Sequence, residues 1–166
     1  MFTFPRKTKY PTDAQLEIWT LKRNNIPGKE IAKLKDVTQA FVSKTLKITT
    51  KRIEDLLVNA AKTNRITLEI IDPVFGFAKG YHHTLKDVAH LTFSRQNGVQ
   101  VWYEHQGDCA DCDIFNECRN MLLNEFKERN LQPKSETLAP TNLADELFLK
   151  LESLSQKKKD SQNDTQ

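Results

Sequence analysis

Apolar residues in the first third of the chain recur at the three- and four-residue spacing of amphipathic helices. Thr12 and Gln15 have the spacing of a capping box and predict the start of a helix over about 13–25. A second, shorter helix is expected after Pro27, because proline suits the first turn of a helix. The residues on its apolar side are Ile31, Ala32 and Leu34.

The stretch 30–46, EIAKLKDVTQAFVSKTL, predicts two helices joined by a tight turn. Thr38 is expected to cap the second helix, because its hydroxyl can accept from the free N–H groups of the first turn. Val42 is expected to anchor this helix in the core, beside Val37 from the turn. Asp36 stands where a left-handed residue is common, and aspartate is one of the few side chains that tolerate that conformation.

The polar outer face of this second helix is a candidate surface for double-stranded DNA. Glutamine can bind adenine in a major groove, lysine can bind guanine or a phosphate, and serine can bind several groups. We expect the helix to continue to about Thr63. The candidate contact residues are Thr38, Gln39, Ala40, Ser43, Lys44 and Lys47, with Arg52 further along.

The stretch 30–46 resembles the helix-turn-helix of bacterial and archaeal regulators, usually written EIAxxLGVSxxxVSxxL. EIA, V-T and VSKTL match, whereas Lys35-Asp36 replaces the usual Leu-Gly. The stretch from LEIWTLKRNNIPGKEIAKL to RIEDLLVNAAKT resembles LuxR-type and sigma region-4 segments and, most of all, archaeal Tfx-like regulators. The resemblance does not extend to the C-terminal half. It implies DNA binding and control of transcription by Thr38, Gln39, Ser43 and Lys44.

Beyond residue 65 the hydrophobic period changes to that of strands. ITLEII alternates as a strand does, and VAHLTFS and GVQVWYEH predict a hairpin with Asn97-Gly98 in its turn. The stretch that contains Gly76 and Gly80 predicts turns. A helix is expected from about Ile114 to Arg129.

A stripe of leucines marks a further amphipathic helix near the end of the chain, formed by Leu143, Leu147, Leu151 and Leu154. This stripe can pack on the rest of the chain or join two copies into a homodimer. The fold class expected is α+β. It comprises a helix-turn-helix domain (1–65), a small antiparallel hairpin and helix forming a Cys-rich metal domain (66–131), a C-terminal amphipathic helix (141–156) and a disordered tail (157–166).

Charge is unevenly distributed along the chain. Residues 1–65 carry a net charge of +8, and residues 66–166 carry −5. A basic half that faces a polyanion and an acidic half held away from it are typical of nucleic-acid-binding proteins. No apolar run reaches membrane-spanning length, and the first residues lack the apolar segment of a signal peptide. We therefore expect a cytoplasmic protein with no membrane partner.

Three cysteines, Cys109, Cys112 and Cys118, form a C-x₂-C-x₅-C pattern. An odd number in a reducing compartment favours a metal site over disulfides. His105 is the preferred fourth ligand, and a [4Fe–4S] cluster is preferred to zinc because zinc sites more often use two separated pairs. The spacing resembles the last three cluster ligands of endonuclease III-type glycosylases and WhiB-type regulators, whose further upstream cysteine is missing here. The other open candidates for the fourth ligand are His82, His83, His90, Asp108 and Asp111.

Together these patterns predict a sequence-specific DNA-binding transcriptional regulator that acts as a homodimer. Its metal or iron–sulfur site would sense redox or metal state or brace the fold. One alternative is an RNA-polymerase-associated factor that uses a sigma-like helix-turn-helix for protein contacts. A cluster-containing nucleic-acid-processing protein is another, although no acid–base constellation typical of an enzyme is evident.

Overall fold

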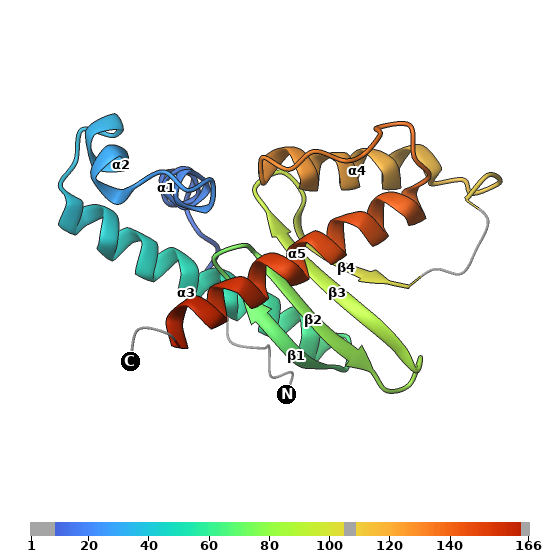
Figure 1. Cartoon of the computed structure of the whole chain (residues 1–166). Helices are drawn as coiled ribbons and strands as arrows, with labels where there is room; N and C mark the ends of the chain where they lie inside the picture. Colours follow the sequence, from blue (N-terminus) through green and yellow to red (C-terminus); the bar gives the residue numbers. More distant parts are fainter. Residues whose placement is uncertain (1–8, 105–108, 164–166) are drawn as a thin grey trace.

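The computed structural model describes residues 9–104 and 109–163 of the chain. Over these residues the fold is α+β, with five helices and one four-stranded antiparallel sheet. The elements run in the order α1 (Asp13–Arg23), α2 (Gly28–Leu34), α3 (Gln39–Thr63), β1 (Ile66–Asp72), β2 (Phe77–His82), β3 (Asp87–Ser94), β4 (Gly98–Tyr103), α4 (Phe115–Glu128) and α5 (Pro140–Asn163). Figure 1 shows the sheet between α3 on one face and α4 and α5 on the other.

Local capping signals define the helices of the N-terminal region. Thr12 and Gln15 form the expected capping box, in which the Gln15 N–H donates to the Thr12 hydroxyl and the Thr12 N–H to the Gln15 side chain. Thr38 caps α3 by accepting from the Phe41 N–H at 3.1 Å. The predicted end of this helix at Thr63 is confirmed.

The turn between α2 and α3 has the expected left-handed residue. Asp36 has a φ of 51°, and the Val37 N–H donates to the Ala32 carbonyl at 3.0 Å, which closes α2. A small core holds the three N-terminal helices together, with Val37 packed against its edge; its buried members are Ile18, Ile31, Ala32 and Val42. Leu34, predicted on the apolar side of α2, is instead 66% exposed. The chain turns immediately after it, and Val37 packs against this core instead.

The four strands form a simple meander in the order β1-β2-β3-β4. The three predicted strands and the hairpin at Asn97-Gly98 are confirmed, and Gly98 has a φ of +67°. The prediction of turns around Gly80 was wrong, because Gly80 lies inside strand β2. A Cβ at Gly80 would lie 2.4 Å from the Thr67 carbonyl oxygen. The glycine therefore permits a close approach of β1 to β2 and does not break the strand.

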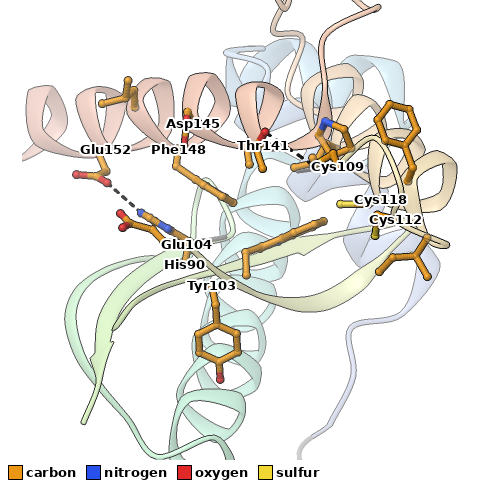
Figure 2. Close-up of a pocket in the computed structure, with 17 residues that line it drawn as sticks. His90, Tyr103, Glu104, Cys109, Cys112, Cys118, Thr141, Asp145, Phe148 and Glu152 are labelled. Carbon is orange, nitrogen blue, oxygen red and sulfur yellow. Dashed lines mark hydrogen bonds and ion pairs between the residues drawn. The ribbon is translucent and has the colours of Figure 1, made fainter. Parts of the chain in front are cut away.

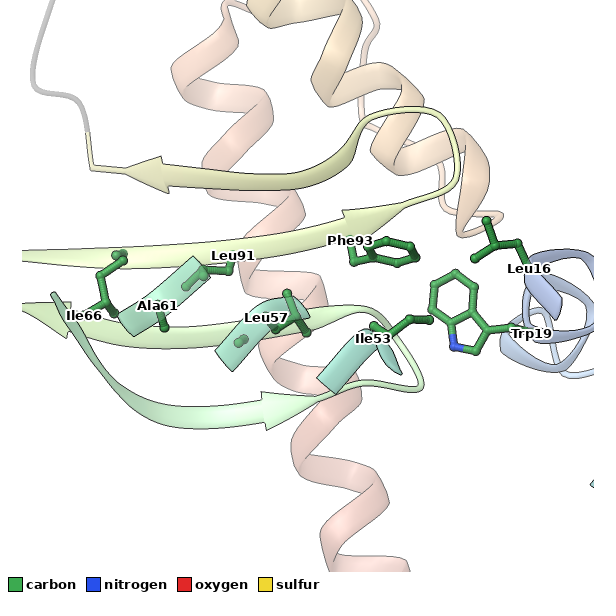
Figure 3. Close-up of a cluster of buried hydrophobic side chains, with 10 residues drawn as sticks. Leu16, Trp19, Ile53, Leu57, Ala61, Ile66, Leu91 and Phe93 are labelled. Carbon is green, nitrogen blue, oxygen red and sulfur yellow. The ribbon is translucent and has the colours of Figure 1, made fainter. Parts of the chain in front are cut away.

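One hydrophobic core joins the N-terminal helices to the first face of the sheet. Figure 3 shows Ile53 and Leu57 of α3 directed at this face, with Trp19 of α1 beside Phe93 of β3. The Trp19 and Phe93 rings are 5.6 Å apart in an edge-to-face arrangement. Helices α1 and α3 and the sheet, predicted to belong to separate domains (1–65 and 66–131), therefore share a core.

The second face of the sheet is covered by α4 and α5. Phe77 of β2 packs here against Leu122 and Phe126 of α4. The leucine stripe of α5 completes this second core through Leu143, Leu147 and Leu151, all fully buried. Of the two possibilities for the stripe, the structure therefore shows packing on the chain itself.

Helix α5 is longer than the sequence indicated. It spans Pro140–Asn163 rather than 141–156, so the part of the predicted disordered tail that the structure describes is helical. Lysine and glutamine, which are frequent after residue 155, are good helix formers and extend a helix that its buried leucines already hold. In the described part of the chain, no helix combines the length and the apolar character needed to cross a bilayer.

A buried polar network ties α4 to the other layers. The Arg129 guanidinium contacts the Glu125 carboxylate at 2.6 Å and donates to the carbonyls of Gly76 and Phe93, each at 3.1 Å. Arg23 of α1 donates to the Glu128 carbonyl at 2.7 Å. The network satisfies carbonyls at the turn before β2 and at the end of β3, and it links α1 to α4.

Candidate functional site

The first candidate site is the outer face of the N-terminal half of α3. Figure 1 shows this half of the helix extending beyond the sheet, next to α2. The side chains on this face are free of the core, because Val42, Thr45 and Thr49 occupy the opposite side. Six of the seven residues predicted for DNA contact are exposed here, namely Thr38, Gln39, Ala40, Ser43, Lys44 and Lys47, together with Phe41 and Ile48.

Arg52, the seventh predicted contact, is not exposed with them. Its side chain is half-buried and donates to the Gln15 side-chain oxygen at 2.7 Å and to the Tyr10 carbonyl at 3.4 Å. These bonds hold the segment before α1 against α3. The structure therefore gives Arg52 an intramolecular role.

Phe41 adds a residue that the sequence pattern did not identify. It is 51% exposed on the first turn of α3. The available signal was its position next to Val42, since neighbouring residues of a helix point in directions about 100° apart. An exposed phenyl ring near a recognition surface can contact the methyl group of thymine.

The second candidate site is a cavity of about 500 Å³ between the sheet, the start of α4 and α5. Figure 2 shows side chains from all three elements directed into it. The aromatic rings of Trp102, Phe115 and Phe148 line it, whereas the ring of Tyr103 points to the opposite face of the sheet (Figure 2). Trp102 is held by a bond from its indole N–H to the Thr92 hydroxyl at 2.9 Å.

All three cysteines line this cavity. Cys109 is buried, Cys112 is exposed and Cys118 is half-buried in the first turn of α4. The Cys112 N–H donates to the Cys109 carbonyl at 3.2 Å, which turns the chain between them. Burial raises the pKa of the Cys118 thiol, and the nearby Cys109 and Cys112 raise it further. The three cysteines of the C-x₂-C-x₅-C pattern therefore lie around one cavity.

The predicted metal site lies only partly within the described residues. His105, the preferred fourth ligand, and Asp108 lie outside them. Among the residues that are described, no three or more His, Cys, Asp and Glu side chains form a group that could hold a metal ion. His82 accepts a bond from the Leu85 N–H at 3.0 Å, and His83 bonds to the Thr67 hydroxyl at 2.9 Å. The set of Cys109, Cys112, Cys118 and His105 stays a prediction.

His90 lies at the other end of the cavity and is buried. Its Nε2 lies 3.1 Å from a carboxylate oxygen of Glu152, whose second oxygen accepts from Lys79 at 2.9 Å. Burial lowers the pKa of His90, and the bond to Glu152 partly opposes that shift. His90 and Glu152 are 62 residues apart in the sequence, so no local pattern could have paired them.

Comparison with known proteins gives no relative for this chain: no family model matches it, and neither does any curated protein or solved structure.

Proposed function

We propose that this chain is a sequence-specific DNA-binding transcriptional regulator that inserts the start of α3 into a major groove. The observation that carries the proposal is the exposed face of Gln39, Ser43, Lys44 and Lys47 on a helix end that extends beyond the sheet. A helix fits the width of a B-DNA major groove, and its first turns then meet the base edges.

The side chains on this face offer contacts to base edges, to phosphates and to a methyl group. Gln39 is placed to bind an adenine edge, and Ser43 reaches a base or a phosphate. Lys44 and Lys47 neutralise phosphates or bind guanine. Phe41 offers an apolar contact to a thymine methyl group. The net charge of +8 over residues 1–65 supports an electrostatic contribution that weakens as salt rises.

Two copies of the chain would be needed for a usefully long site, because one recognition helix contacts only a few base pairs. The homodimer remains part of the proposal. Leu143, Leu147 and Leu151 are buried within the chain, so the proposed dimer uses a surface other than this stripe.

The proposed regulatory centre is the cysteine-lined cavity. Its support is the C-x₂-C-x₅-C spacing together with the finding that all three cysteines line the same cavity. Thiolates and an imidazole suit zinc, and thiolates suit an iron–sulfur cluster. In either case Cys109, Cys112, Cys118 and His105 would supply the ligands.

The decisive experiment selects duplexes from a random pool with the full-length protein and measures their affinities by fluorescence anisotropy. Gln39→Ala is expected to weaken the selected site by roughly 5- to 100-fold and to relax base choice at one position. If Lys44 contacts a phosphate, Lys44→Ala is expected to weaken the affinity for selected and unrelated duplexes alike. If Lys44 binds guanine, the affinity for the selected duplex is expected to fall most.

Matched controls are Gln96→Ala in the β3–β4 turn and Lys127→Ala on α4, which are both exposed and lie away from α3. Both are expected to leave the affinity unchanged. The proposal fails if no duplex binds at about 50 mM salt, where phosphate contacts are strongest. It also fails if the α3 variants behave like these controls.

A further inference from the structure

The cavity beside α5 has the size and walls of a small-molecule site. Ligand sites typically enclose about 300–1,000 Å³, and this one encloses about 500 Å³. Its aromatic residues come from β4, α4 and α5, so a bound molecule would be flanked by rings from three elements. Such walls favour a ligand with an apolar or aromatic body.

The charged side chains that line the cavity are acidic, whereas Lys79 and Arg119 lie next to lining residues, at Glu152 and Phe115 respectively. The lining includes the carboxylates of Glu104, Asp145 and Glu152, and no lysine or arginine is among the described residues that line the cavity. Lys79 pairs with Glu152 at 2.9 Å, so that carboxylate is already partly neutralised. Glu104 and Asp145 supply the remaining negative charge. An anionic ligand would be repelled here, whereas a cation would be attracted.

Two of the three carboxylates lie away from the thiols. Figure 2 shows His90, Glu104 and Glu152 at one end of the cavity, and Cys112 and Cys118 at the other. Phe148 lies along the side between them, stacked on His90 with ring centroids 4.2 Å apart. A molecule with one charged end and an apolar body matches this division.

We propose that the cavity binds an organic cation, with its ammonium or guanidinium group near Glu104 and Glu152 and its apolar body along Phe148. Carboxylates compensate the lost hydration of the cation, and aromatic faces attract it through cation–π interaction. The proposal concerns described residues only and needs no metal at the cysteines.

The position of the cavity gives this ligand a route to α3. Strand β3 carries His90 on the side of the cavity and Leu91 in the core that it shares with α3. A ligand that orders the His90 side of β3 therefore acts on a strand in contact with the proposed recognition helix. This regulatory consequence rests on the proposed DNA-binding function, whereas binding of the cation does not.

The test compares three ligands with one carbon skeleton. 6-Phenylhexylamine, 6-phenylhexan-1-ol and 6-phenylhexanoate carry a cationic, a neutral and an anionic end, and each is titrated into the full-length protein by calorimetry. The amine is expected to bind at least about fivefold more tightly than the alcohol, and the carboxylate most weakly. Equal affinities for amine and alcohol, or no binding by any of the three, would overturn the proposal.

Glu104→Gln supplies the residue-level test. This substitution is expected to weaken the affinity for the amine about three- to fivefold and to leave the affinity for the alcohol unchanged. Glu69→Gln is the matched control, because Glu69 is an exposed carboxylate on β1 that does not line the cavity. A Glu104→Gln variant that binds the amine as tightly as the wild type contradicts the assigned charge interaction. An equal loss of affinity for the amine and for the alcohol contradicts it as well.

A final measurement separates this inference from the proposed function. The amine is added to the full-length protein with its selected duplex, and DNA affinity is followed by anisotropy. A change in DNA affinity supports regulation through β3. If the amine binds the protein but no duplex does, the DNA-binding proposal fails while the cation site stands.

Discussion

The imidazole of His90 lies parallel to the phenyl ring of Phe148, with centroids 4.2 Å apart and planes inclined by 2°. His90 belongs to strand β3 and Phe148 to helix α5, so the stack joins the sheet to its C-terminal cover. Phe77 stacks against His90 at 6.1 Å. Glu152, one turn after Phe148, bonds to the ring edge. The histidine is therefore enclosed by two aromatic rings and one carboxylate.

This arrangement predicts a pH dependence of stability. Burial lowers the pKa of His90 in the folded state, whereas the unfolded value is about 6.5. Between these two values the unfolded chain binds more protons, so the free energy of unfolding decreases as pH falls below about 6.5. In His90→Phe, the free energy of unfolding should lose the part of its decrease between about pH 7 and about pH 5.5 that comes from protonation of His90. Denaturant titrations at each pH measure it.

The control for this prediction is His83→Phe, which replaces an exposed histidine. Its free energy of unfolding should follow the same pH profile as that of the wild type. A His90→Phe variant that retains the wild-type slope would show that His90 does not contribute to the acid sensitivity.

A second prediction concerns the close approach of β1 and β2. Gly80→Ala places a methyl group 2.4 Å from the Thr67 carbonyl oxygen. Because this oxygen belongs to the backbone of the neighbouring strand, we expect a loss of about 1–3 kcal/mol in the free energy of unfolding. Gly28→Ala is the control, since nothing lies within 4 Å of its Cβ position and it begins helix α2. That variant should be neutral or up to about 1 kcal/mol more stable.

The contrast between these glycines illustrates what could be predicted from the sequence. Helix starts depend on residues three apart, as at Thr12 and Thr38, and were located correctly. Strand β2 was missed because Gly80 suggested a turn. The structure shows that a glycine is needed at this position because the backbone of Thr67, on the neighbouring strand, lies too close for a side chain. Local periodicity also placed Leu34 in the core, although the chain turns immediately after it.

The candidate sites show the same division between local and distant information. The exposed face of α3 followed from helical spacing, and the three cysteines lie within ten residues of one another. The cavity wall is assembled from β3, β4, α4 and α5, so its carboxylates and rings meet only after folding. The shared core of α3 and the sheet likewise depends on packing between distant segments. Local periodicity does not show such packing, so the sequence suggested a domain boundary at residue 65.

A third prediction addresses the buried ion pair of Glu125 and Arg129. Both side chains are almost fully buried, and Arg129 also binds the carbonyls of Gly76 and Phe93. Glu125→Ala leaves a buried guanidinium without its counter-charge, and we expect a loss of roughly 3–5 kcal/mol in the free energy of unfolding. Glu54→Ala, which removes one of the two carboxylate partners of exposed Lys51, should have little effect. Similar losses in the free energy of unfolding of both variants would show that burial does not make the Glu125–Arg129 pair more important than the exposed pair.

A fourth prediction tests the metal hypothesis directly. Protein purified without oxygen is expected to contain either iron and sulfide, with a broad absorbance near about 400 nm, or zinc and no colour. Cys112→Ser should lower the metal content per chain, because it removes one proposed thiolate. Replacing exposed Ser153 of α5 with alanine should not change it. Metal-free protein with all three thiols titratable would remove the metal site from the proposed function.

The last prediction decides where two copies of the chain could meet. Leu147 is fully buried against α4 and the sheet, whereas Leu149 on the same helix is 69% exposed. Leu147→Ala should therefore reduce the free energy of unfolding by about 2–5 kcal/mol, and Leu149→Ala should change it little. If the stripe only completes the chain's own core, neither substitution alters the oligomeric state measured by light scattering under native conditions. A shift from dimer to monomer in Leu147→Ala, with the folded state retained, would place the stripe in an interface between copies.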